Sequence, residues 1–248
     1  YIEDVGGVIS VGNRDLINGT NYNIDFKYEY YMQKGQMISL GIFYKYLEDP
    51  IEKTMKAAAG QLQSYQNADM AQVTGFEVEF SKNLSFFNKN KESFLDNIFI
   101  SGNLTMMYTQ VKLSSNSSNA NTNSTRPLEG ASPLMSNIDI RYKKRFDKDK
   151  TKSCDLLIGL SYNVFSKRLS AVGVNGIGDQ YETSVNSLNF ITDVTINDKV
   201  SFKLNIFNLI NQNIKTYQQN VYDDSGDKLI NSFNKGVSFR LSIGYNIF

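Results

Sequence analysis

Two groups of acidic side chains are the first places in this sequence where chemistry could occur. Glu77 and Glu79 lie two residues apart, so on a β-strand both carboxylates would project from one face and could act as an acid–base pair. The segment YDDSGDKLI, Tyr222 to Ile230, gathers aspartates that could bind calcium. A calcium loop needs more oxygen ligands at ordered spacing, however, and Asp-Ser-Gly-Asp suits a tight turn between two short strands. We interpret Glu77 and Glu79 as part of a water-facing strand surface, and the second segment as a turn.

The rest of the composition offers little for catalysis. None of the 248 residues is histidine, which removes the most common general base and metal ligand. The single cysteine, Cys154, excludes an internal disulfide and is interpreted as an inert thiol at the start of a strand. No glycine-rich phosphate loop, nucleophile elbow or zinc spacing is present. We therefore expect no enzymatic activity, no metal site and no cofactor.

Charge also excludes one class of partner. Lys and Arg number 26 against 25 Asp and Glu, so no overall field would attract nucleic acid. The sequence contains no run of about 18 apolar residues, which a membrane-spanning helix would need, and it does not open with a signal-peptide pattern. A β-barrel crosses lipid without any such apolar run.

Long stretches in which apolar and polar residues alternate predict the strands that would position any site. In NYNIDFKYEYY, Asn21 to Tyr31, the even positions are aromatic or aliphatic and the odd positions are polar until Tyr31. Such alternation predicts a strand with one apolar and one wet face. About nine strands of this kind follow one another, many near the roughly 9–11 residues that a tilted membrane strand needs. The predicted strands centre on Asn21–Tyr31, Ile38–Tyr46, Val73–Phe80, Ile98–Tyr108, Ile138–Tyr142, Leu156–Tyr162, Leu188–Ile196, Val200–Ile206 and Val237–Ile247.

The two faces of these strands predict lipid on one side and water on the other. Aromatic residues gather toward the strand ends of the apolar face, as the aromatic girdles of a membrane barrel do. Charged residues recur on the opposite face, which predicts a wet lumen. The tyrosines are Tyr28, Tyr30, Tyr44, Tyr46, Tyr108, Tyr142, Tyr162 and Tyr245. The charged residues are Asp25, Lys27, Glu29, Glu77, Glu79, Asp139, Arg141, Asp193 and Lys203.

Connections between the strands alternate between short and long. Short turns with long loops opposite are typical of outer-membrane barrels, whose long loops lie outside the cell. The long connections also contain the low-complexity run SSNSSNANTNST and two prolines, Pro127 and Pro133, that we expect to shape the backbone. A soluble β-sandwich is the alternative, but its strands would be shorter and its loops more even. The long connections are Leu47–Gln72, Lys112–Met135, Phe165–Ser187 and Leu209–Asn234.

The order of several segments resembles the C-terminal part of TonB-dependent outer-membrane receptors, particularly those of Bacteroidota. VGNRDLINGTNYNIDFKYEYY (Val11 to Tyr31) resembles the family's passage from an extracellular loop into a strand, and GIFYKYLEDPIEK (Gly41 to Lys53) its next strand. TGFEVEFSKNL, STRPLEGASPLMSNIDIRYK and SFKLNIFNLINQ are similar to further blocks in the same order. The resemblance covers nearly the whole chain, residues 1–248.

The resemblance implies an all-β, antiparallel transmembrane barrel of about 22 strands, of which this chain supplies about the last nine. A plug domain and a TonB-contacting segment would lie before Tyr1. The implied function is uptake of a ligand through a plugged barrel in the cell outer membrane. The alternative is a structural or interaction barrel that docks a surface lipoprotein or a secretion partner. Implied partners are outer-membrane lipid, TonB, the barrel-assembly machinery and, in some receptors, a surface lipoprotein lid of the SusD type; the substrate is not indicated.

The last strand resembles the signal that the barrel-assembly machinery reads. Asn234, Gly236, Phe239 and Leu241 match its polar-x-Gly-x-x-apolar-x-apolar pattern, and the chain ends on Phe248. Phe248 departs from the pattern, because it directly follows Ile247 and so falls out of the apolar register, whereas the family's terminal aromatic is usually in register.

Overall fold

The computed structural model describes two β-sheets and two short 3-10 helices, η1 (Leu84–Phe87) and η2 (Phe94–Asn97). The described residues are 2–5, 8–33, 35–56, 61–87, 94–112, 122–123, 125–149, 152–173, 176–222 and 225–246. The terminal Phe248 and most of the low-complexity run therefore lie outside the described residues.

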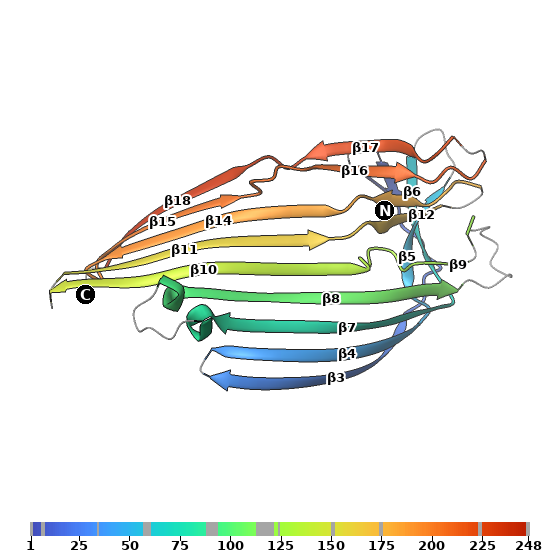
Figure 1. The fold of residues 1–248 in the computed structure, drawn as a ribbon. Coiled ribbons are helices and arrows are strands. Elements are labelled where there is room, and N and C mark those ends of the chain that lie inside the picture. Colours follow the sequence, from blue (N-terminus) through green and yellow to red (C-terminus); the bar gives the residue numbers. More distant parts are fainter. Residues whose placement is uncertain are drawn as a thin grey trace.

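Nine long strands form one sheet, which we call the wall (Figure 1). Every neighbouring pair in the wall is antiparallel, and its order is β18-β15-β14-β11-β10-β8-β7-β4-β3. The nine predicted strands are thus confirmed, although most are longer than the alternation indicated. Their bounds are β3 (Thr20–Gln33), β4 (Gln36–Glu48), β7 (Met70–Asn83), β8 (Ile98–Lys112), β10 (Leu134–Asp149), β11 (Lys152–Phe165), β14 (Val185–Ile196), β15 (Val200–Phe207) and β18 (Ser238–Tyr245).

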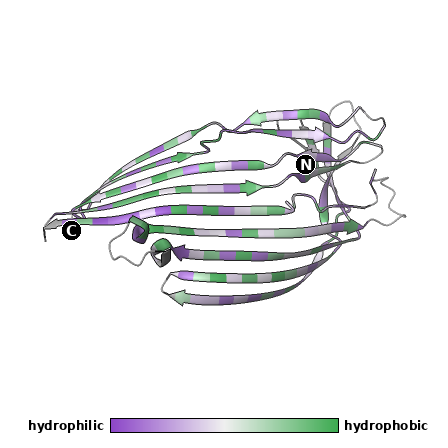
Figure 2. Cartoon of the chain, in the orientation of Figure 1, coloured by the Kyte–Doolittle hydropathy of each residue, from purple (hydrophilic) through white to green (hydrophobic). Residues whose placement is uncertain are grey.

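The separation of apolar and polar faces continues from strand to strand, because the register pairs apolar residues with apolar residues on the same face. Figure 2 shows hydrophilic and hydrophobic residues alternating along the wall strands. In β3 the even-numbered Ile24 and Phe26 are 72% and 65% exposed, and their partners Tyr44 and Ile42 are also exposed apolar residues. Large apolar side chains that stay exposed over a whole face fit a wall surrounded by lipid better than a folded core.

The wall has two outer strands, β3 and β18, each paired on one side only within the described part of the chain. An unpaired strand edge leaves a row of backbone groups without partners, which is costly in lipid. In a membrane these edges therefore need further strands to pair with.

The second sheet is called the extracellular layer after the side of the membrane expected for the long connections. It corrects our picture of these connections as loops, in which short strands were expected only around the turn of Tyr222 to Ile230. Eight short strands, from the segment before β3 and from three of the long connections, pair in the order β1-β2-β6-β5-β12-β13-β16-β17. Figure 1 shows them gathered at one end of the wall. The alternation of apolar and polar residues did not predict these strands, because they are short. Two of their pairings, β2 with β6 and β5 with β12, are parallel. Their bounds are β1 (Ile2–Val5), β2 (Val8–Val11), β5 (Ile51–Lys56), β6 (Gln61–Asn67), β12 (Arg168–Gly173), β13 (Gln180–Glu182), β16 (Asn213–Gln218) and β17 (Lys228–Asn234).

Candidate functional site

Part of the β8–β10 connection packs against the polar face of the wall rather than its lipid face. Ala71 and Val111 are fully buried, with Leu47 and Leu128 packed against them. By alternation, Ala71 shares its strand face with Glu77, and Val111 shares its face with Asn103. Leu128, from the β8–β10 connection, therefore reaches over the lumen side, where its backbone N–H donates to Thr109 Oγ1 at 3.0 Å. The connections fold inward at the mouth of the lumen.

A buried ion pair joins two of these connections. Arg126, in the two-residue strand β9 (Thr125–Arg126), donates from both terminal nitrogens to the two oxygens of Glu52 in β5, at 2.7 and 2.6 Å. Each side chain is only 1% exposed. A bidentate guanidinium–carboxylate pair fixes the relative orientation of its two partners, and breaking it would leave an uncompensated buried charge.

A second ion pair lies next to the first. Glu129 Oε2 accepts from the Lys53 backbone N–H at 2.6 Å, and Glu129 Oε1 lies 3.4 Å from Lys53 Nζ. Burial raises the pKa of the Glu129 carboxyl, and the contacts with Lys53 oppose that rise. The two pairs together attach the β8–β10 connection to the β5–β6 hairpin.

Asp179 lies at a contact among three connections, one of which is the β8–β10 connection described above. Its side chain is fully buried and accepts from the Gly173 backbone N–H at 2.9 Å and from Asn123 Nδ2 at 2.7 Å. Asn123 also donates to Gln219 Oε1 at 3.0 Å. Neutral donors thus satisfy both oxygens of a buried carboxylate. No sequence pattern indicated this contact, because Asn123 lies 56 residues from Asp179 and 96 residues from Gln219.

The polar face of the wall carries the predicted charges, several of them in ion pairs. Lys27 Nζ lies 2.8 Å from Glu29 and 3.4 Å from Glu79, while Glu77 accepts from Thr105 at 3.4 Å. Glu77 and Glu79 therefore have separate partners, which supports the wet-wall interpretation over an acid–base pair. Asn137 donates to Asn103 at 2.8 Å across β10 and β8 on the same face.

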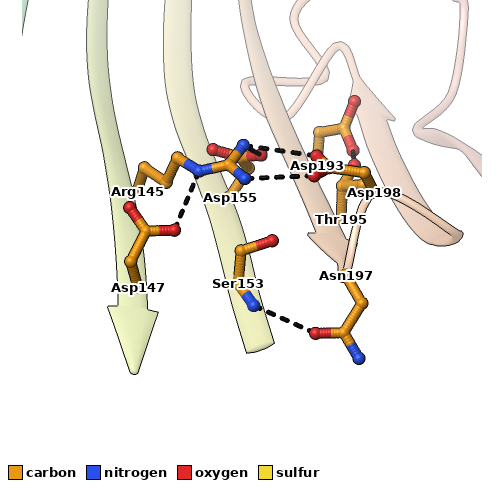
Figure 3. A network of polar contacts seen from close by, with 8 residues as sticks. All are labelled: Arg145, Asp147, Ser153, Asp155, Asp193, Thr195, Asn197 and Asp198. Atoms are coloured by element: carbon orange, nitrogen blue, oxygen red, sulfur yellow. Dashed lines mark hydrogen bonds and ion pairs between the residues drawn. The ribbon is translucent and has the colours of Figure 1, made fainter. Parts of the chain in front are cut away.

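The opposite end of the wall carries a cluster that we call the rim network (Figure 3). Arg145, near the end of β10, donates to Asp147 at 3.0 Å, to Asp155 at 2.9 Å and to both oxygens of Asp198 at 3.0 and 3.2 Å. Next to it, Ser153 donates its backbone N–H to Asn197 Oδ1 at 3.0 Å. The two short turns β10–β11 and β14–β15 are thus held together, and Asn197 and Asp198 both adopt positive φ, 53° each.

The rim network predicts that the folded rim becomes less stable in acid. Hydrogen bonding to Arg145 lowers the pKa of Asp198, so this carboxylate stabilises the folded rim above its unfolded pKa. That contribution is lost as the pH falls through the lowered value. We expect hydrogen-exchange protection of the Asn197 amide, corrected for intrinsic rates, to fall between pH 6 and about pH 3. Asp198→Asn should show weaker protection at pH 6 and little further loss; an unchanged acid profile in that variant would contradict the assignment.

Residues of the assembly signal lie around the start of the last strand. Gly236, at φ 77°, donates its N–H to Asn234 Oδ1 at 2.7 Å, and its carbonyl accepts from Asn208 Nδ2 at 2.8 Å. Phe239 and Leu241 are 70% and 69% exposed on β18. Asn234 and Gly236 therefore form the turn that leads into β18, whereas the two apolar residues belong to the lipid face. The role of these residues as an assembly signal stays a prediction.

Arg126 is the residue that reading the sequence missed. We expected Arg126-Pro127 to act through the proline, but the arginine supplies the buried contact. Its partner Glu52 lies 74 residues away, so no local pattern could identify it. A charged residue within an otherwise polar loop carries no sign of burial.

Among the described residues, no group of three or more His, Cys, Asp or Glu side chains is arranged to hold a metal ion. Cys154 is a free, half-buried thiol. No helix in the described ranges is long and apolar enough to cross a membrane.

The wall, its lipid face and its mouth together define an outer-membrane β-barrel domain. The family model for the TonB-dependent receptor-like β-barrel matches residues 3–209. The chain belongs to this family, whose members are outer-membrane receptors and transporters. No curated protein sequence matches the chain.

Proposed function

We propose that the chain forms the C-terminal part of a receptor that takes up a ligand through a plugged barrel, driven by TonB. The inward packing of the β8–β10 connection carries the proposal, since Leu128 packs on the lumen side of the wall and Arg126 ties the connection to Glu52 in the extracellular layer. Such a layer narrows the entrance and presents polar side chains to a ligand arriving from outside. A plug and a TonB-contacting segment would be supplied by residues before Tyr1.

A second proposal concerns surface partners and assembly. The extracellular layer also offers a surface on which a lipoprotein lid, such as those of Bacteroidota receptors, could dock. Asn234, Gly236, Phe239, Leu241 and Phe248 would be read by the barrel-assembly machinery, as the resemblance of the last strand implies. A chain without transport activity would favour docking as the main role.

Transport can be tested without knowing the ligand. Cells carrying the receptor, cells lacking it and cells lacking TonB would be grown in one complex medium, and the compounds left in the medium measured by mass spectrometry. We expect at least one compound to be depleted from the medium only by cells that have both the receptor and TonB. Depletion that depends on the receptor but not on TonB would contradict the proposed mechanism, and no receptor-dependent depletion would favour docking.

Orientation can be tested on intact cells. If the extracellular layer faces outward, added protease should cut within Lys112 to Met135 and spare the short turn at Asp147 to Ser153. Cleavage would be mapped by mass spectrometry of the full chain, and lysed cells show which sites are cut when both sides are accessible. Cleavage of the short turn alone in intact cells would invert the topology.

A further inference from the structure

A small recess, about 180 Å³ in volume, lies where the extracellular layer meets the wall. Strands β11 and β14 of the wall and β12, β13, β16 and β17 of the layer each supply one lining residue. Lys235, in the turn before β18, completes the lining. An apolar cavity of about 150 Å³ can hold a benzene molecule, so the recess has room for one six-membered ring.

The apolar part of the recess consists of two cross-strand pairs. Phe165 pairs with Val185 on the wall, and Ile214 pairs with Phe233 in the extracellular layer. Ile214 is 4% exposed, whereas Phe165 and Phe233 remain 39% and 42% exposed. By alternation along β11 and β14, the wall pair lies on the polar face. The two phenylalanine rings therefore face the mouth of the lumen and not lipid, and a ligand arriving there could cover them.

The charged part of the recess has one cation without a partner. Arg168 donates from Nε and Nη2 to Glu182 Oε1, at 3.0 and 2.8 Å, so these two charges neutralise each other. The Lys235 ammonium is exposed and forms no hydrogen bond or ion pair with the described residues. The lining thus has two cations against one anion, a net charge of +1, which favours an anionic ligand group.

We propose that the recess binds an aromatic carboxylate, as part of the ligand that the receptor takes up, with the ring against Phe165 and Phe233 and the carboxylate on Lys235. The inference rests on the proposed uptake and names the chemical class of its ligand. An aromatic ring fits this lining better than a sugar ring, because sugar hydroxyls would lose their hydrogen bonds to water against Val185 and Ile214. Aromatic rings also gain from offset or edge-on contacts with phenylalanine.

Fluorine NMR of the full receptor in detergent tests the site with three small probes. 4-Fluorobenzoate carries the proposed group, 4-fluorobenzylamine replaces its carboxylate with a cation, and 4-deoxy-4-fluoroglucose replaces its aromatic ring with a sugar. We expect 4-fluorobenzoate to bind with a Kd of about 1 mM, which is typical of a ligand with about ten non-hydrogen atoms. The other two should bind at least about tenfold more weakly. Empty micelles give the background from partition into detergent.

Variants of the lining separate this recess from general attraction of an anion to the layer. Lys235→Gln should weaken binding of 4-fluorobenzoate about fivefold, and Lys235→Glu should reverse the preference toward 4-fluorobenzylamine. The matched control is Lys228→Gln, which removes an exposed cation of β17 that does not line the recess and should have no effect. Val185→Phe should fill the recess and weaken binding about tenfold.

Three results would overturn the inference. The first is equal binding of the acid and the amine by the wild type, and the second is equal affinity of the wild type and Lys235→Gln for the acid. The third is no binding of 4-fluorobenzoate to a receptor that still depletes a compound from the medium with TonB, which would leave the uptake proposal intact. Selective binding of the acid without TonB-dependent depletion would support the recess and contradict uptake instead.

Discussion

Replacement of Arg126 by Ala is expected to destabilise the extracellular layer by about 3–5 kcal/mol, because the Glu52 carboxylate would remain buried without its cation. Both side chains are 1% exposed, so solvent cannot take the place of the lost guanidinium. The wall should stay folded, since its strands are held by their own ladders. The change should therefore appear as local opening of the layer.

Hydrogen exchange of the full protein measures this opening. Amides of β5 and β6 should exchange at least about a hundredfold faster in the variant, since 1.4 kcal/mol corresponds to a factor of ten. Amides in the middle of β7 and β8 serve as internal controls and should not change. Unchanged exchange in β5 and β6 would show that the pair does not hold the layer.

Two further variants distinguish a lost charge pair from lost packing. Arg168→Ala removes the cation of a half-exposed pair in the same layer, Arg168 with Glu182 at 2.8 Å, and should cost only about 0–1 kcal/mol. The double variant Glu52→Leu with Arg126→Met removes both charges and should recover most of the stability. A double variant as unstable as Arg126→Ala would point to packing instead.

Replacement of Leu104 by Arg is expected to destabilise the barrel by about 2–4 kcal/mol, because the residue lies at the middle of β8 on the lipid face. Its cross-strand partners are Val78 and Ser136. The neighbouring Asn103→Arg places the same side chain on the lumen face and should cost little. Urea titration of the full chain in lipid vesicles would measure both values, and equal costs would refute the assignment of the two faces.

Most of the wall could be predicted from the sequence, because the alternation that defines each of its strands is a local pattern. A strand between lipid and water must alternate along its whole length, so stretches such as Asn21 to Tyr31 predict both a strand and the direction of each side chain.

The extracellular layer could not be predicted in the same way. Its strands are three to seven residues long, too short for a periodicity to stand out, and partners such as Glu52 and Arg126 come from different connections. Asp179 illustrates the same limit, since its oxygens bind Gly173 and Asn123 in two separate segments. Contacts between distant segments depend on the three-dimensional arrangement of the wall beneath them.

The parallel pairings of the extracellular layer affect how fast its segments can move. β2 pairs with β6, and β5 with β12, so the segment before β3 and two different connections share backbone hydrogen bonds. A free loop samples new positions within nanoseconds to microseconds, whereas displacing these connections requires several ladders to break together. The entrance should therefore open as one cooperative unit on the slower timescale of local unfolding, and its rate, rather than diffusion of a ligand through open loops, would then limit access to the lumen.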